Sequence, residues 1–429
     1  MVVHMNKVKT GLTLLRRYAV FVSSPLVVVT LFVMLSGTLL LLNVQTHRQL
    51  VNAPLRRQVL EWRRPSDGEA TVKSRESDAA IFRWAPIGPA HKSDDSGELG
   101  SSPKWDVEDA TCEPNANLTE LRWFKALPEH FRHFVAHRHC RYFPMIHNHP
   151  KTCGVLDGAK SVPYLLLVMK STPAQAERRD AIRRTWGREG LASGGRKIKR
   201  LFLLGLPPDT PEGILQQKLV HYEDRVYGDI LQWSFHDSFF NLTLKELNFL
   251  KWFHMFCPRV SFVFKGDDDV FVNTANVIEY LALIRPGSDL FAGDVIEDGM
   301  PIRNVESKYY IPPPIFRPAR YPPYAGGGGF LMSGVLTRRL HAAAKLVDNF
   351  PIDDVWLGMV LRRLNVIPLH HPGFRTFGIV RRRETPMNKD PCFYRGLLLV
   401  HKLMPPELLS MWETIHNPAL RCYKSRLQV

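Results

Sequence analysis

The sequence predicts an α/β fold in which a central, mostly parallel sheet is flanked by helices and preceded by a transmembrane helix and a stem. Two observations predict the sheet. From residue 162 onward, apolar segments of strand length alternate with helical segments, and three carboxylates directly follow one of those apolar segments. A long uncharged segment near the N-terminus predicts the transmembrane helix.

Composition excludes several classes of protein. The chain has 429 residues, of which 45% are hydrophobic and 23% are charged, so disordered and collagen-like proteins are excluded for most of its length. The formal charge of +16 is unevenly spread, because residues 1–64 hold nine Lys and Arg against one acid, a net charge of 9 − 1 = +8. Half of the excess therefore borders the uncharged segment, and no signature of a nucleic-acid-binding module accompanies it.

Residues 18–46 contain no charged side chain and are bordered by Arg16, Arg17 and Arg48. About 20 apolar residues cross a bilayer as a helix, whereas a cleaved signal peptide has an apolar region of only about 7–15 residues. We therefore expect an uncleaved signal anchor. The expected organisation is a cytosolic tail at 1–17, the anchor at 18–46, a flexible lumenal stem at 47–110 and a lumenal catalytic domain at 111–429.

Sequons and cysteines favour a lumenal position for the chain that follows the anchor. Asn117 and Asn241 each begin an Asn-Leu-Thr sequon and are the expected glycosylation sites. All six cysteines follow the anchor, as expected in an oxidising compartment. They are Cys112, Cys140, Cys153, Cys257, Cys392 and Cys422. No two of them form a CxxC pair, which argues against a zinc site, and the sequence does not choose among their fifteen pairings. We expect a type II membrane topology.

The alternating segments give an order of elements. Residues 111–159 are expected to hold little regular strand, and Ser171-Thr172-Pro173 is expected to begin the first helix of the sheet domain. The expected strands lie at 162–170, 199–205, 230–235, 260–265 and 290–296. The expected helices lie at 173–186, 212–226 and 242–256. Ligands of such sheets bind at the carboxyl ends of the strands, so we expect the functional side chains there.

Three consecutive carboxylates, Asp267, Asp268 and Asp269, stand between the apolar segments SFVF and VFV. Adjacent negative charges repel one another unless a cation or solvent relieves them. Alternate residues of an extended chain point the same way, so Asp267 and Asp269 can face one ligand while Asp268 faces elsewhere. Such oxygen ligands suit magnesium or manganese bound to a substrate phosphate. The structural alternative is a solvated acidic turn.

A pair of acids, Asp353 and Asp354, opens a helix that is expected to run through Leu364. Acids at this position are favoured by the helix dipole and serve as caps, which is the structural interpretation. The functional interpretation is that one of the two acts as a general base on a bound hydroxyl.

A basic helical segment, ERRDAIRRTWG at 177–187, follows the first strand. Arg179 and Arg183 are four residues apart, as are Ile182 and Trp186, so one helix face can pack while the guanidinium groups reach toward the strand ends. Guanidinium groups suit phosphate, and an indole can pack against a base or the core. The alternative is a solvated basic face.

Four consecutive glycines, Gly326 to Gly329, stand in YPPYAGGGGF. Such a run leaves backbone amides open to a ligand and permits unusual dihedral angles. The segment lacks the lysine and the Ser or Thr of a P-loop and the spacing of a dinucleotide-binding loop, so both of these are excluded.

Taken together, the motifs resemble the beta-1,3-glycosyltransferases of glycosyltransferase family 31, and within it the beta-1,3-N-acetylglucosaminyltransferases. The resemblance covers roughly residues 105–429 in consistent order. The motifs that carry it are FLLG, RRDAIRRTWG, FFNLTLKE, FKGDDDVFVN, KYYIP, YPPYAGGGGF, PIDDVWLGM, FRTFGI and a late LVH.

The resemblance implies a GT-A-type nucleotide-sugar-binding fold in a Golgi membrane enzyme. The implied reaction is inverting transfer of GlcNAc from UDP-GlcNAc to the 3-hydroxyl of a terminal β-galactose, on N-acetyllactosamine or keratan-sulfate-type glycans. A divalent metal, Mn²⁺ or Mg²⁺, is implied at Asp267, Asp269 and His401. Asp354 is the implied base, with Asp353 as the alternative. The implied donor-binding residues are Lys170, Arg179, Arg183, Trp186, Asp267, Asp268, Gly327 and Gly328.

Two alternatives for function stay open at this point. One is a beta-1,3-galactosyltransferase with the donor UDP-Gal, because one residue near a sugar can switch the choice of donor. The other is a catalytically silent glycan-binding protein on the same fold. Arg381, Arg382 and Arg383 form a cationic run that is expected either to favour sulfated acceptors or to be a solvated loop. The oligomeric state is left open by the sequence.

Overall fold

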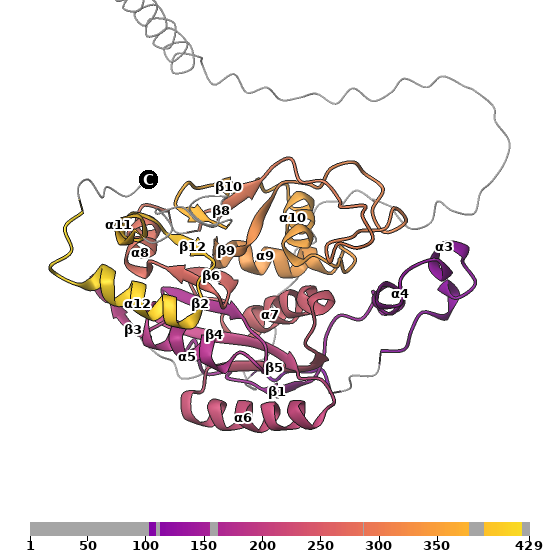
Figure 1. Cartoon of the computed structure of the whole chain (residues 1–429), viewed down its shortest axis with the longest axis horizontal. Helices are drawn as coiled ribbons and strands as arrows, with labels where there is room; N and C mark the ends of the chain where they lie inside the picture. Colours follow the sequence, from indigo (N-terminus) through magenta and orange to yellow (C-terminus); the bar gives the residue numbers. More distant parts are fainter. Residues whose placement is uncertain (1–102, 109–111, 155–161, 286, 377–389, 423–429) are drawn as a thin grey trace, which may run out of the picture. The chain divides into compact units, whose positions relative to one another are not determined.

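A computed structural model describes residues 103–108, 112–154, 162–285, 287–376 and 390–422 of the chain (Figure 1). All of them belong to one compact unit, Gly97–Val429. The expected tail, the expected anchor and almost all of the expected stem lie outside the described residues. Within the described ranges, no helix is both long enough and apolar enough to cross a membrane.

In the described part of the chain, nine strands form one sheet in the order β1-β5-β4-β2-β6-β9-β8-β10, with β3 paired to β4 at the side. The strands are β1 (Met145–His147), β2 (Leu165–Lys170), β3 (Gly190–Ala192), β4 (Arg196–Leu206), β5 (Ile230–His236), β6 (Phe262–Asp267), β8 (Phe291–Ile296), β9 (Tyr324–Ser333) and β10 (Leu369–His370). Strands β5, β4, β2 and β6 are parallel neighbours. By contrast, β9 runs antiparallel to both β6 and β8, and β1 runs antiparallel to β5.

Strand β10 is parallel to β8, so six of these nine strands run in one direction and the sheet is mostly parallel, as expected, with β1, β3 and β9 reversed. The parallel part coincides with the strands that were expected from their apolar composition. The antiparallel insertion is β9, the glycine-rich segment for which the sequence predicted open backbone amides and no strand. Glycine is a poor strand former, but β9 lies between two strands and is held by hydrogen bonds on both sides.

Helices cover both faces of the sheet, and the side chains of β2 show how the two cores divide. Leu166 and Val168 pack in one core with α7, α9 and α10, whereas Leu165, Leu167 and Met169 pack in the other with α5, α8 and α12. Alternate residues of a strand point to opposite faces, so a strand that is buried on both faces is apolar throughout. Figure 1 shows α7, α9 and α10 together on one side of the sheet.

Helix α7 has the bounds that were expected from the sequence. The helix after β2 begins at Ala176 instead of 173, with Gln175 as its N-cap, so Ser171 and Thr172 are left in the loop at the strand end. The helices are α3 (Arg122–Lys125), α4 (Glu129–Ala136), α5 (Ala176–Arg184), α6 (Pro211–Tyr227), α7 (Leu242–Phe256), α8 (Thr274–Ala282), α9 (Gly334–Ala344), α10 (Asp353–Arg363), α11 (Pro391–Gly396) and α12 (Pro405–His416).

A second, three-stranded sheet has the order β11-β12-β7, formed by β11 (Phe374–Arg375), β12 (Leu399–His401) and β7 (Val270–Val272). It joins the C-terminal part of the chain to the segment that follows β6.

The six cysteines form three disulfides, each between two cysteines that follow one another in the sequence. They are Cys112–Cys140, Cys153–Cys257 and Cys392–Cys422.

Candidate active site

Two neighbouring parallel strands end in charged residues at the same edge of the sheet. The last residues of β2 and β6, Lys170 and Asp267, lie opposite each other in the register of the pair. The Nζ atom of Lys170 is 3.1 Å from Oδ1 of Asp267 and 2.6 Å from Oδ2 of Asp353. Burial alone would lower the pKa of Lys170, but the attraction of these two carboxylates outweighs burial and raises it. The ammonium group therefore stays charged between two acids.

The third carboxylate of the acidic run, Asp269, lies against His401. Strand β12 pairs antiparallel with β7 and sets His401 opposite Val270. The Nε2 atom of His401 is 3.2 Å from Oδ1 of Asp269. One ligand atom from each of Asp267, Asp269 and His401 lies within 4.8 Å of the others. The three side chains that were expected to hold a metal are thus brought together from β6, the turn after it and β12.

The chemistry of this donor set fits a divalent cation. The Nδ1 atom of His401 is 2.7 Å from the carbonyl oxygen of Thr376, which can only accept, so Nδ1 donates the proton. The lone pair of a neutral His401 is therefore on Nε2, on the side of the two carboxylates, as is usual for a metal-binding histidine. The two carboxylates suit Mg²⁺ or Mn²⁺, and the imidazole adds a nitrogen ligand of the kind that transition metals accept.

Asp268 turns away from the other two carboxylates. Its Oδ1 accepts a hydrogen bond of 2.8 Å from Nη1 of Arg178, and the same nitrogen is 3.4 Å from Oδ2 of Asp269. Burial raises the pKa of Asp268 although Ser171 and Arg178 oppose that change. Arg178 could not be singled out from the sequence, because it is one of several arginines in the same helix. From α5 it contacts both Asp268 and Asp269 and so holds the acidic turn in place.

The two acids at the start of α10 lie in different surroundings. Asp353 is buried and bonded to Lys170, and although burial favours its neutral form, the charge and hydrogen bond of Lys170 lower its pKa. Asp354 is half-buried, and its Oδ1 accepts from the amide of Val355 at 2.7 Å. Burial, followed by the charge of Asp353, raises the pKa of Asp354 to about 7. One acid is thus fixed as an anion and the other is ready to exchange a proton near neutral pH.

Gly327 and Gly328 in β9 lie between the acids of α10 and the histidine of β12. A Cβ atom at Gly327 would be 3.4 Å from Oδ2 of Asp354 and 3.8 Å from Nζ of Lys170. A Cβ atom at Gly328 would be 3.4 Å from Cβ of His401. These glycines were expected to leave their backbone amides open to a ligand. Instead they are strand residues, and what they provide is the absence of side chains beside the site.

Two buried ion pairs anchor α7 beneath Lys170. Lys265 of β6 bonds to Glu246, and Nζ of the adjacent Lys245 is 2.7 Å from Oδ1 of Asp237. Burial raises the pKa of Glu246 and lowers that of Lys265, so each ion depends on its partner to stay charged. The motif FFNLTLKE therefore supplies structural support under the site.

Arg179, Arg183 and Trp186 are placed differently from their expected role in a nucleotide pocket. Arg179 is 0% exposed and makes two hydrogen bonds of 2.7 Å to Glu223. Arg183 is bonded to Asp229 at 2.9 and 2.7 Å. The indole of Trp186 is buried and donates to the carbonyl of Val270 at 3.0 Å. Arg179 also donates to Ser171 and Thr172 in the loop after β2, so it reaches a strand end, but all three side chains are buried and their polar groups are bonded to acids and carbonyls of the protein itself.

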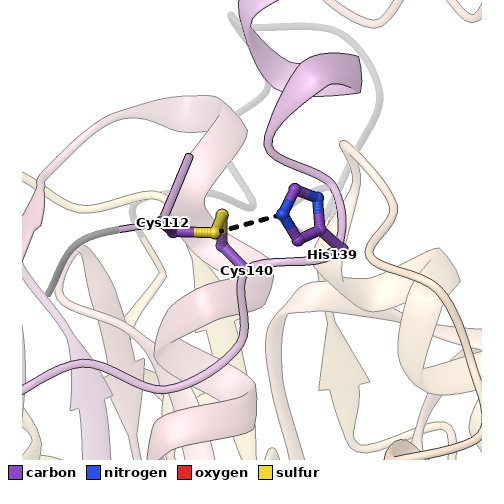
Figure 2. Close-up of side chains that lie close together, drawn as sticks. All are labelled: Cys112, His139 and Cys140. Carbon is purple, nitrogen blue, oxygen red and sulfur yellow. Dashed lines mark hydrogen bonds between the residues drawn. A yellow bond between two sulfur atoms is a disulfide. The ribbon is translucent and has the colours of Figure 1, made fainter. Parts of the chain in front are cut away.

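A second cluster of potential metal ligands, shown in Figure 2, is formed by Cys112, His139 and Cys140. Its cysteines are joined in a disulfide, and Nε2 of His139 is 3.4 Å from the sulfur of Cys112. Metal binding requires thiolates, so in the disulfide form this cluster is a structural link.

The two sequons also lie in different surroundings. Asn117 is exposed in the short 3₁₀ turn Ala116–Leu118. Asn241 is half-buried, and its Nδ2 donates to the carbonyl of His236 at 2.8 Å. Thr243 of the same sequon is buried and donates to the carbonyl of Phe350. Of the two, the Asn117 sequon is the one open to a modifying enzyme in the folded chain. Arg381, Arg382 and Arg383 lie outside the described residues.

Comparison with known proteins identifies relatives of the whole catalytic region. The family model described as Galactosyltransferase matches residues 177–372. UDP-GlcNAc:betaGal beta-1,3-N-acetylglucosaminyltransferase 7 of Rattus norvegicus is 55% identical over 315 residues, 73% of this chain and 78% of the relative. N-acetyllactosaminide beta-1,3-N-acetylglucosaminyltransferase 4 of Homo sapiens is 45% identical over 339 residues, 79% of this chain and 81% of the relative.

Solved structures resemble the chain only distantly. The galactosyltransferase LgtC, bound to donor and acceptor sugar analogues, aligns with 59% of this chain and 96% of its own at 11% identity and a TM-score of 0.31. No conclusion is drawn from so low a score. The sequence relatives are sufficient by themselves: the chain belongs to the beta-1,3-N-acetylglucosaminyltransferase family.

Proposed function

We propose that the chain transfers GlcNAc from UDP-GlcNAc to the 3-hydroxyl of a terminal β-galactose and so extends poly-N-acetyllactosamine chains. The names of the relatives support both the donor and the acceptor. The observation that carries the proposal is the arrangement at the sheet edge. Asp267, Asp269 and His401 form what we call the metal-binding trio. Lys170 lies between Asp267 of this trio and Asp353 at the start of α10.

We place the donor diphosphate at the metal-binding trio, on a GT-A-type fold. When bound there, Mn²⁺ or Mg²⁺ would neutralise the negative charge of the diphosphate. The chain's own part is to hold the ligands in place. Thr376 fixes the orientation of the His401 ring, Arg178 braces the acidic turn, and Lys170 fixes Asp267.

We assign the general base to Asp354. In a single displacement the acceptor oxygen bonds to C1 of GlcNAc, the bond from C1 to the diphosphate oxygen breaks, and UDP leaves from the opposite face with inversion. The hydroxyl proton passes to the carboxylate of Asp354. Asp353 is the weaker candidate because its carboxylate already accepts a hydrogen bond from Lys170, which lowers its pKa.

The proposal is tested by turnover of the chain with UDP-GlcNAc, UDP-Gal and UDP-GalNAc on N-acetyllactosamine, with and without EDTA. We expect transfer of GlcNAc that EDTA abolishes, with a β1,3 linkage in the product. The family model described as Galactosyltransferase favours UDP-Gal as the second candidate donor. Preferred use of UDP-Gal would establish that alternative, and glycan binding without release of UDP would establish a silent binding protein.

We also propose a type II anchor at residues 18–46, with the catalytic domain in the Golgi lumen. Support comes from the uncharged segment and from the three disulfides, which form in oxidising compartments. A protease-protection assay on sealed Golgi vesicles tests this proposal, and digestion of the domain in intact vesicles would refute it.

We further propose that Arg381, Arg382 and Arg383 favour sulfated acceptors. Changing the three arginines to Ala tests this proposal: an unchanged ratio of turnover on sulfated to turnover on plain N-acetyllactosamine would refute it.

A further inference from the structure

The ring of His401 is oriented by a residue outside the metal-binding trio. Its Nδ1 atom donates to the carbonyl oxygen of Thr376 at 2.7 Å, and its Nε2 atom lies 3.2 Å from Asp269. Because the two nitrogens belong to one rigid ring, a shift of the Thr376 carbonyl also moves Nε2. The geometry of the trio therefore depends on whatever holds Thr376 in place.

The paired part of β11 ends one residue before Thr376. In the ladder of β11 with β12, the last pair is Arg375 with Val400. Thr376 is the next residue of the chain and is 6% exposed. A buried amide N–H group is costly to leave without an acceptor. Contacts from outside this small sheet must therefore fix the backbone of Thr376.

Asp294, in strand β8 of the large sheet, supplies the acceptor. Its Oδ2 atom accepts from the amide of Thr376 at 3.1 Å, across 82 positions of sequence. Its Oδ1 atom is 3.7 Å from Nδ1 of His370, which is beyond hydrogen-bonding distance. The carboxylate of Asp294 thus connects a strand of the large sheet to the residue that orients His401.

The glycine segment of β9 limits the position of Thr376 as well. In the register of β8 with β9, Asp294 alone stands opposite the four glycines at 326–329, so the pairing is irregular there. A Cβ atom at Gly326 would lie 2.6 Å from Cγ2 of Thr376, which is too close for two carbon atoms. The missing side chain of Gly326 therefore leaves the space that Thr376 occupies.

We propose that Asp294 is a positioning residue for His401 and acts through the backbone of Thr376. The inference rests on the metal site of the proposed function and adds to that site a residue of the large sheet. Groups that orient a metal-binding histidine typically contribute about 10–100-fold to metal affinity. Asp294 acts one residue further out, so we expect an effect on the order of tenfold.

The first experiment measures the dissociation constant of Mn²⁺ for the full chain in detergent micelles, from the electron paramagnetic resonance signal of the free ion. Asp294→Ala should raise this constant about tenfold, because Thr376 loses its anchor. Asp294→Asn should stay within about threefold of wild type, because the amide oxygen of asparagine still accepts a hydrogen bond. The matched control is Asp289→Ala, two residues before β8, where the acid is bonded to Arg339 instead.

The outcomes separate this inference from the proposed function. Wild-type affinity in Asp294→Ala, or an Asn variant as weak as the Ala variant, overturns the positioning role and leaves the metal site standing. A wild-type chain that binds no Mn²⁺ refutes the metal site itself and the inference with it.

The second experiment follows turnover as a function of Mn²⁺ concentration. Asp294→Ala should need about tenfold more Mn²⁺ for half-maximal turnover and should regain most of its kcat when Mn²⁺ is saturating. Gly326→Ala should raise the same requirement, because the added methyl group displaces Thr376 from the other side. A purely structural role would lower kcat at every Mn²⁺ concentration. A loss of kcat that excess Mn²⁺ does not restore, or an unchanged Mn²⁺ requirement in Gly326→Ala, overturns the proposal.

Discussion

At the scale of single residues, neighbouring acids of one helical turn divide into different chemical roles. Asp353 is held as an anion by Lys170, whereas the pKa of Asp354 is raised to about 7. Asp354→Asn should therefore lower kcat by roughly 10²–10⁴-fold, the contribution typical of a general base, while UDP-GlcNAc binding is kept. Single-turnover kinetics and donor calorimetry measure the two quantities. Turnover equal to wild type would remove Asp354 from the role.

The raised pKa of Asp354 also predicts that its ionised carboxylate destabilises the folded chain, although the same carboxylate serves catalysis. In the unfolded chain the Asp354 carboxyl has its ordinary pKa of 3.8, and in the folded chain it has a pKa of about 7. The folded state therefore holds the proton more tightly, and stability is lost as the pH rises from about 4 through 7. We expect Asp354→Asn to raise Tm relative to wild type at pH 8 and to change it little at pH 4. Equal Tm differences at both values would contradict the shift.

Another prediction at this scale concerns His401. His401→Gln removes the only nitrogen ligand of the described trio and should weaken Mn²⁺ binding at least about tenfold, measured by calorimetry. His416→Gln is the matched control, because His416 lies on α12 and packs with its ring tilted against Trp412 instead. Equal Mn²⁺ affinity in the two variants would show that His401 is not a ligand.

At the scale of elements, the site depends on the glycine segment of β9, which has no side chains. Gly327 lies beside Asp354 and Lys170, where the Cβ atom of an alanine would be in ordinary contact. The larger side chain of valine would extend into the space beside the base. We expect Gly327→Ala to keep most of kcat/KM and Gly327→Val to lower it by at least about tenfold, with Tm nearly unchanged. A Val variant as active as the Ala variant would show that this space is not used.

Much of the element pattern could be predicted from the sequence, because long apolar segments and helical periodicity are local signals. Helix α7 and strand β5 lie within a residue of their predicted bounds. The directions of Asp267 and Asp269 followed from the alternation of an extended chain. The pairing of Arg179 with Glu223 and of Arg183 with Asp229 could not be predicted, since each acid is more than forty positions away in the sequence.

At the scale of the whole molecule, the disulfides close loops of different length. Cys153–Cys257 spans 104 residues and Cys112–Cys140 spans 28. The chain-entropy relation gives about 5 kcal/mol for the longer loop and about 3.5 kcal/mol for the shorter one. Replacing Cys153 and Cys257 by Ala should therefore lower the midpoint of urea unfolding more than replacing Cys112 and Cys140. The reverse order would mean that loop length does not govern their contributions.

The pairing of β12 with β7 has a consequence for the order of synthesis. His401 enters the site from a strand close to the end of the chain, whereas its partners Asp267 and Asp269 are made much earlier. A nascent polypeptide that has folded its parallel strands still lacks this ligand. The three candidate metal ligands are therefore brought together only when translation is almost finished, and termination between β10 and β12 leaves all the strands of the nine-stranded sheet in the chain while removing His401.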